Sequence, residues 1–91
     1  MSLSTDDHSV RINDHVVSVT GRTGPIEATW TLLIDGQEAD SAKASGKFVL
    51  SADLPDGSPV AASVRQGAFG PTEVTIDHDG QEVTRFKGFV I

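Results

Sequence analysis

The residues best placed to do chemistry are the acidic side chains of a motif that occurs twice, IDGQE at 34–38 and IDHDGQE at 76–82. In the second copy Asp77 and Asp79 stand just before Gly80, as acidic residues do in the middle of an EF-hand calcium loop. Three interpretations are open for such a motif: a calcium loop, a substrate clamp or the turn of a β-hairpin.

The calcium interpretation fails on spacing. If Gly80 is the obligatory loop glycine, Thr75 takes the first ligand position and Phe86 takes the position of the bidentate glutamate, and neither can fill that role. The first copy of the motif lacks the second aspartate altogether. Asp-Gly between two alternating runs is, in contrast, a strong hairpin signal, because glycine accepts the positive φ of a tight turn. The repeated motif therefore predicts two hairpins.

The three histidines, His8, His15 and His78, give no recognised zinc-ligand spacing. His15 and Asp14 could be combined with a serine into a triad, but no Gly-x-Ser-x-Gly motif is present. We therefore expect no catalytic residue, no metal and no cofactor, and predict that the protein is not an enzyme.

Two glycine loops, at 21–25 and 67–71, lack the Lys-Ser/Thr ending of a phosphate-binding P-loop. Their prolines favour connections between strands, because proline cannot continue a strand ladder. Phe69 is an aromatic residue within the second loop. It either folds back into the core or stands out as a contact residue.

The composition limits the classes of partner. Seven Lys and Arg residues against 13 Asp and Glu residues give a net charge of −6, and the basic residues are scattered along the chain. We therefore expect neither nucleic acid nor a membrane as partner. There is no cysteine, the first residues do not resemble a secretory signal, and no apolar run is long enough to cross a bilayer. These features predict a cytoplasmic protein.

The elements that must position these residues are strands throughout. Apolar residues alternate with polar ones in several short runs that are separated by Gly, Pro and Asp turns. The expected strands are 10–12, 15–20, 29–34, 37–42, 47–54, 59–66, 73–76, 81–86 and 89–91. This pattern predicts an all-β fold, a small antiparallel β-sandwich or barrel of seven to nine short strands. Residues 1–7 are expected to form a disordered tail, and 8–91 a single β domain.

The repetition extends beyond the two motifs. SVTGRTGPIEATWTLLIDGQEA from Ser18 and SVRQGAFGPTEVTIDHDGQEV from Ser63 share the order of their landmarks: Ser-Val, a glycine loop ending in Gly-Pro, a strand into Ile-Asp, and Gly-Gln-Glu. This order favours an internal duplication, in which two similar β-units pack their apolar faces together.

The apolar C-terminus is the remaining candidate site. Phe86, Phe89, Val90 and Ile91 either dock as a closing strand or leave an edge open to another chain. Together with Phe69, the residues Phe86, Phe89 and Ile91 form the candidate interaction surface.

Strand, Asp-Gly turn and second strand recur in TWTLLIDGQE (29–38), FVLSADLPDGSPVAASV (48–64) and VTIDHDGQE (74–82). In this recurrence the chain resembles the β-domains of Fas apoptotic inhibitory molecule proteins. The resemblance implies a compact, non-catalytic β-sandwich that acts through protein contacts, and it carries over no catalytic residue.

The function that we expect is a protein-interaction or self-association module, with another protein or a second copy (a homodimer) as partner. The alternative is a small-ligand-binding barrel, in which inward Trp30, Leu32, Phe48 and Leu50 would line a cavity. A hydrolase or a metal-dependent enzyme is the third hypothesis, and no motif supports it.

Overall fold

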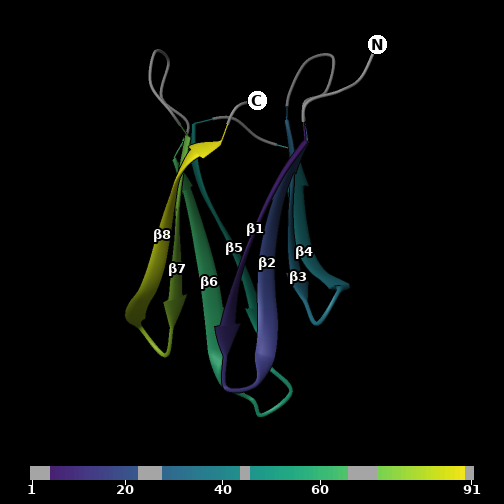
Figure 1. The fold of residues 1–91 in the computed structure, drawn as a ribbon, viewed down its shortest axis with the longest axis vertical. Helices are drawn as coiled ribbons and strands as arrows, with labels where there is room; N and C mark the ends of the chain where they lie inside the picture. The colour runs from purple at the N-terminus through teal and green to yellow at the C-terminus, as the bar shows by residue number, and fades with distance from the viewer. Residues whose placement is uncertain (1–4, 23–27, 44–45, 66–71, 90–91) are drawn as a thin grey trace.

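Two four-stranded antiparallel sheets make up the protein (Figure 1). The computed structural model describes residues 5–22, 28–43, 46–65 and 72–89. The first sheet contains β1 (Thr5–Ile12), β2 (His15–Arg22), β3 (Thr29–Ile34) and β4 (Gln37–Lys43). The second contains β5 (Lys47–Asp53), β6 (Pro59–Arg65), β7 (Thr72–His78) and β8 (Gln81–Phe89). The expected all-β sandwich is confirmed, and none of the described segments is a helix that could span a membrane.

Each sheet is a simple meander, because every strand pairs with its neighbours in the sequence. The tight turns within the pairs β1–β2, β3–β4, β5–β6 and β7–β8 all lie at one end of the sandwich, the lower end in Figure 1. We call this the turn end. The opposite end, where Lys43 leaves the first sheet and Lys47 enters the second, is the link end.

The core forms because alternate residues of each strand point inward, as the period of two requires. In β3 the buried residues are Trp30, Leu32 and Ile34, and in β7 they include Val74 and Ile76. Trp30 and Leu32 are fully buried and pack in the same core cluster as Leu50, so they fill the interior. Each such side chain stabilises the fold by about 1.5–3 kcal/mol relative to an exposed one.

The repeated motifs form hairpin turns, as predicted. Asp35 and Gly36 have φ values of 51° and 82°, and Asp79 and Gly80 have values of 52° and 79°. Positive φ at both central residues defines the type I′ turn, whose twist matches that of the flanking strands. The second turn is shorter than the expected 77–80, because β7 continues to His78, which pairs with Gln81.

The two sheets repeat each other down to an irregularity in their pairing. Between Leu32 and Leu33 the β3–β4 register shifts, so that Ala39 is the extra residue. The β7–β8 register shifts between Ile76 and Asp77, with Val83 as the extra residue. Such a bulge increases the local twist of a strand pair. The same bulge, at the same distance from the same type of turn, confirms the internal repeat in structural terms.

The largest differences from the expected strand boundaries lie in the first and last strands. β1 begins at Thr5, inside the expected tail, because Thr5 pairs with Arg22 of β2. The prediction of a separate strand at 89–91 is wrong for Phe89, because this residue is the last of β8. Phe89 pairs with Thr72, and a second register shift separates this pair from the pair Glu73–Lys87. Residues 90 and 91 lie outside the described part of the chain.

Candidate functional site

Of the four residues predicted as an interaction surface, Phe86 is the one whose side chain the structure describes. Phe86 is half-buried, packs against the core, and its ring centroid lies 4.8 Å from that of His8 in β1. Phe69, Ile91 and the side chain of Phe89 lie outside what the structure describes. Phe86 therefore helps to close the sandwich between β1 and β8.

A side chain also bridges the other open side of the sandwich, between β4 and β5. The backbone N–H of Ser51 donates a hydrogen bond to Oδ2 of Asp40 at 3.0 Å. An edge strand with free N–H groups is a template for pairing with another chain. Asp40 occupies one such donor on the β5 edge, which makes this edge less available for pairing with another chain.

The outer face of the second sheet carries a row of charged residues across all four strands. Lys47 of β5 pairs with Arg65 of β6, Arg65 with Glu73 of β7, and Glu73 with Lys87 of β8. We call these four residues the charged row. They point outward because their inward-pointing neighbours belong to the core, Val64 and Val74 among them.

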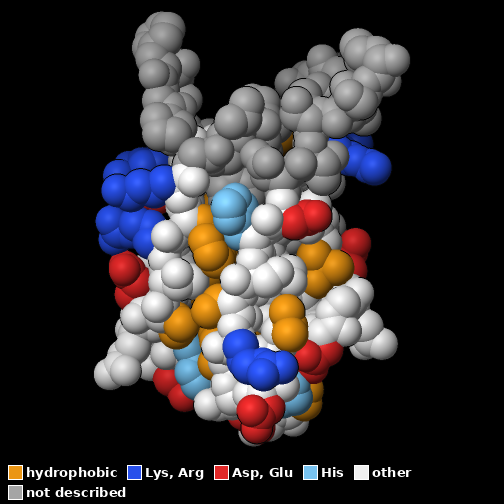
Figure 2. Space-filling model, viewed as in Figure 1, with side chains coloured by type: hydrophobic (Ala, Val, Ile, Leu, Met, Phe, Trp, Pro, Cys, Tyr) orange, Lys and Arg blue, Asp and Glu red, His pale blue; other side chains and the backbone are white. Residues whose placement is uncertain are grey.

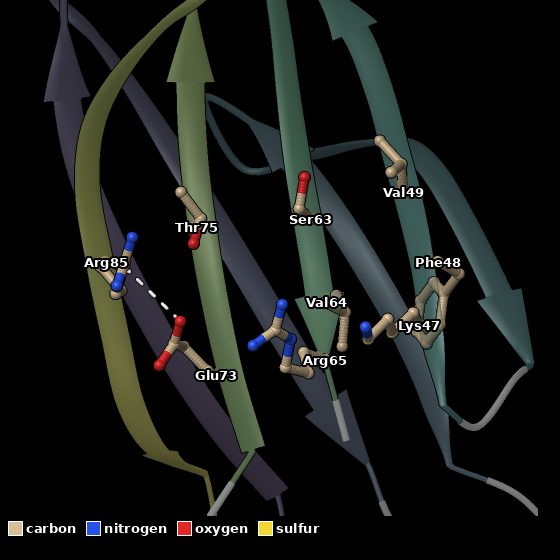
Figure 3. Close-up of a pocket in the computed structure, with 9 residues that line it drawn as sticks. All are labelled: Lys47, Phe48, Val49, Ser63, Val64, Arg65, Glu73, Thr75 and Arg85. Carbon is tan, nitrogen blue, oxygen red and sulfur yellow. Dashed lines mark ion pairs between the residues drawn. The ribbon is translucent and has the colours of Figure 1, made fainter. Parts of the chain in front are cut away.

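A groove of about 430 Å³ lies along this face beside the charged row (Figure 3). Its floor includes Ser63 and Thr75 from the two central strands, and Val49 stands at one side with 59% of its surface exposed. Val49 is the most exposed large hydrophobic residue of the described chain. The complete lining is Lys47, Phe48, Val49, Ser63, Val64, Arg65, Glu73, Thr75 and Arg85.

The cations around the groove differ in their partners. Arg85 donates a hydrogen bond from Nη2 to Oε1 of Glu82 at 2.9 Å, and its Nε lies 3.5 Å from Oε1 of Glu73. The bond to Glu82 and the charges of both glutamates raise the pKa of Arg85. Among the described residues no carboxylate lies within 4.0 Å of the Lys47 ammonium or the Arg65 guanidinium. In Figure 3 these two side chains lie beside each other on adjacent strands.

A second groove, of about 540 Å³, continues along the same sheet toward the turn end. Asp53 and Asp77 contribute to its lining, with Ser51 and Ala61 between them. The outer face therefore changes in charge along its length, from basic near the link end to acidic near the turn end. Figure 2 shows basic side chains gathered beside β8, and acidic side chains with a basic group among them around the turns.

The view of the basic residues as scattered is wrong in three dimensions. Four of the chain's seven Lys and Arg residues, Lys47, Arg65, Arg85 and Lys87, lie on this one face. Strand alternation carried the missing signal, since Lys47 and Arg65 stand out of phase with the apolar residues of their strands. The pairing register was needed to bring them together.

The turn end contains the polar cluster that most resembles a catalytic site. Nδ1 of His15 lies 2.7 Å from Oδ2 of Asp35, and the backbone N–H of Val16 donates to Oδ1 of Asp35 at 2.9 Å. The hydrogen bond from Val16, followed by the one with His15, lowers the pKa of Asp35. This carboxylate is fully used in holding the β3–β4 turn against the start of β2.

On the second sheet, Ser58 and His78 form a hydrogen bond of 2.8 Å through Nε2 of the histidine. The Ser58 hydroxyl donates a hydrogen bond to Asp56, and so does the Ser58 backbone N–H. These two hydrogen bonds lower the pKa of Asp56. Because the proton of Ser58 goes to Asp56, Nε2–H of His78 must be a donor to Ser58. In a hydrolase triad the histidine instead accepts the serine proton, and an aspartate holds its other nitrogen. Here Asp79 approaches the same Nε2, at 3.7 Å.

The metal hypothesis gains no support in the described segments. No group of three or more His, Asp or Glu side chains there is arranged to hold a metal ion. Asp77 lies in β7 and Asp79 in the two-residue turn, so the aspartates of the repeated motif are parts of a hairpin.

A scan against protein-family models, a search of curated proteins and a search of solved structures each found no match to this chain. The function must therefore be argued from the geometry of the molecule itself.

Proposed function

We propose that the protein is a protein-interaction module and that it contacts its partner through the outer face of its second sheet. The observation that carries this proposal is the groove beside Val49, bordered by Lys47, Arg65 and Arg85. Protein interfaces combine an apolar centre with a polar rim and are enriched in arginine. This face brings an exposed valine and two arginines together in a chain whose net charge is −6.

The outer face of the first sheet supports the proposal by contrast. In one row across its middle, Thr20 of β2 is paired to Thr31 of β3 and Thr31 to Ser41 of β4. In the next row the hydroxyl oxygens of Ser9 and Ser18 lie 2.9 Å apart, and Ser18 is paired to the half-buried Leu33. Neither row places two cations beside an exposed apolar side chain, as the second sheet does at Lys47, Arg65 and Val49.

Protein contact is also what the resemblance to Fas apoptotic inhibitory molecule proteins implies. A small-ligand barrel finds less support, because Trp30, Leu32 and Leu50 fill the core. An enzyme is supported least, since the His15 and His78 contacts hold turns together and leave no activated nucleophile.

The proposal is tested by placing a photo-reactive phenylalanine analogue at position 75 or at position 31. Thr75 and Thr31 occupy equivalent places in the two sheets, and both are partly buried residues of a central strand. After irradiation in a lysate of the source cells, we expect a discrete cross-linked partner from position 75 and none from position 31. The adduct should disappear when Val49→Asp is added.

Equal cross-linking from both positions would contradict the proposal. An adduct between two copies of the chain would replace it with self-association through the same face, which is the homodimer alternative. Circular dichroism of each variant must first show the native β-sheet spectrum.

A further inference from the structure

We infer that Lys47 and Arg65 form a binding site for the carboxylates of an acidic, extended segment of a partner protein. This inference rests on the proposed function and names the chemistry that the partner must bring. It begins from a feature that is unfavourable in the isolated molecule.

The unfavourable feature is a pair of like charges. Lys47 and Arg65 are directly opposite each other on adjacent antiparallel strands. The Cβ atoms of such pairs are roughly 4.5–5.5 Å apart, and like charges there destabilise a sheet. At the equivalent places in the first sheet Thr5 stands opposite Arg22, so only one cation is present. The second sheet therefore carries a repulsion that the shared architecture does not require.

No described carboxylate forms an ion pair with Lys47 or Arg65. Glu73 stands opposite Arg65 on β7 and places one negative charge beside the pair, but its ion pair is with Arg85, which Glu82 also binds. The N–H groups of the Lys47 ammonium and the Arg65 guanidinium can therefore donate hydrogen bonds to an acceptor outside the described chain. A guanidinium binds a carboxylate through two parallel hydrogen bonds, and an ammonium adds a compact positive charge beside it.

The surroundings favour a short acidic protein segment over a nucleic acid. Asp53, Asp77 and Glu82 lie on the same face toward the turn end, and the whole chain carries −6. A continuous polyphosphate would be repelled once it passed beyond the charged row. An extended peptide repeats its side chains on one face about every 7 Å. It can therefore place a carboxylate at Arg65 and an apolar side chain on Val49, and end before the acidic region.

The test uses the complete protein labelled with 15N and a blocked pentapeptide with glutamate at its first and fifth positions, valine at its third and serine between them, so that the glutamates and the valine lie on one face of the extended peptide. In NMR titrations at low salt we expect amide shifts confined to the groove, at Lys47, Val49, Ser63, Arg65 and Thr75. The same peptide with glutamine in place of glutamate should produce no saturable shifts. Weakening by added salt would fit a contact between charged groups.

Arg65→Glu should weaken binding of the glutamate peptide by about tenfold or more, the loss expected for a charge-assisted contact. The variant should fold, because position 65 is exposed and the introduced carboxylate would face Lys47 on one side as well as Glu73 on the other. Arg22→Glu, at the equivalent place in the first sheet, makes the same change in net charge and should alter binding by less than about twofold. Lys47→Gln removes the second positive charge without introducing a negative one, and it should also weaken binding of the glutamate peptide.

Equal binding of the glutamine peptide, or equal weakening by Arg22→Glu, would overturn the inference. So would tighter binding of a single-stranded oligothymidylate than of the glutamate peptide, which would make the site a phosphate site. If the peptide fails to bind while the cross-link from position 75 persists and depends on Val49, only the carboxylate site is lost. If peptide binding holds but that cross-link is absent, the proposed function fails instead.

Discussion

The two sheets of this protein share a backbone plan and differ in what they show to solvent. Both are four-stranded meanders with a type I′ turn and a bulge at matching places. Their inward residues are apolar in both. Across the middle of the first sheet the outward residues include a row of Thr20, Thr31 and Ser41, whereas a row of charged residues crosses the second sheet. The inward positions are constrained by the shared core, and the outward positions are free to differ. A surface that only one sheet carries is therefore the natural place for function.

The turn ends differ for a simple covalent reason. In the first sheet Asp35 accepts a hydrogen bond from the backbone N–H of Val16. The residue equivalent to Val16 in the second sheet is Pro59, whose carbonyl still accepts from the N–H of Asp79 at 3.0 Å. Proline has no N–H to return to Asp79. The second sheet instead joins its turns through Ser58 and His78.

The largest expected effect tests the equivalence of the two cores. Leu32→Ala and Ile76→Ala remove fully buried side chains from equivalent positions beside the two bulges. Each should lower the free energy of unfolding by about 2–5 kcal/mol, from lost burial and the cavity left behind. Urea denaturation followed by tryptophan fluorescence measures both. A loss below about 1 kcal/mol in either variant would break the equivalence.

An intermediate effect is expected at the glycines of the two Asp-Gly turns. Gly36→Ala and Gly80→Ala force a side chain into φ values of 82° and 79°, although a Cβ would meet no atom within 4 Å at either place. The cost is therefore conformational, about 1–2 kcal/mol at each turn. Asparagine tolerates positive φ, so Gly36→Asn and Gly80→Asn should cost clearly less. Equal costs for alanine and asparagine, measured by thermal denaturation, would show that the backbone does not set the penalty.

The smallest expected effect distinguishes the turn ends by their response to pH. Because the pKa of Asp35 is lower in the folded protein, its ionised form favours folding. That contribution is complete above the ordinary aspartate pKa of about 3.9, and it is lost as the pH falls through the lowered folded value. Asp35→Asn should therefore be less stable than the wild type at pH 7 and should lose less stability on acidification.

Asp79→Asn is the matched control for this measurement, since Pro59 offers no N–H for its side chain to accept. At pH 7 we expect it to lose less stability than Asp35→Asn, because it loses no hydrogen bond from the backbone. Urea titrations between pH 2.5 and pH 7 give the profiles of both variants. If Asp35→Asn parallels the wild type, the hydrogen bonds from Val16 and His15 do not stabilise the carboxylate.

The fold was predictable because its causes are local. The alternation in TWTLLI and the Asp-Gly pairs each determine a strand or a turn without reference to the rest of the chain. The groove was not predictable in this way, since Lys47 and Arg65 are separated by a hairpin and meet only through the β5–β6 register. The loop between β5 and β6 contains five residues, 54–58, and no simple turn rule fixes that register. The place of Phe86 was not predictable either, since its packing against the core and His8 depends on how β8 meets β1.

The meander order has a consequence for how the chain folds. Since every strand pairs with a neighbour in the sequence, each sheet can assemble from hairpins that close over short loops. Hairpins form in microseconds. A single sheet, however, keeps its apolar face exposed to water until the second sheet packs against it. Docking of the two sheets is then the step that completes the native state. Because the segment between Lys43 and Lys47 is the sole link between them, the first sheet of one molecule can also dock on the second sheet of another. High concentration during refolding should therefore favour domain-swapped dimers.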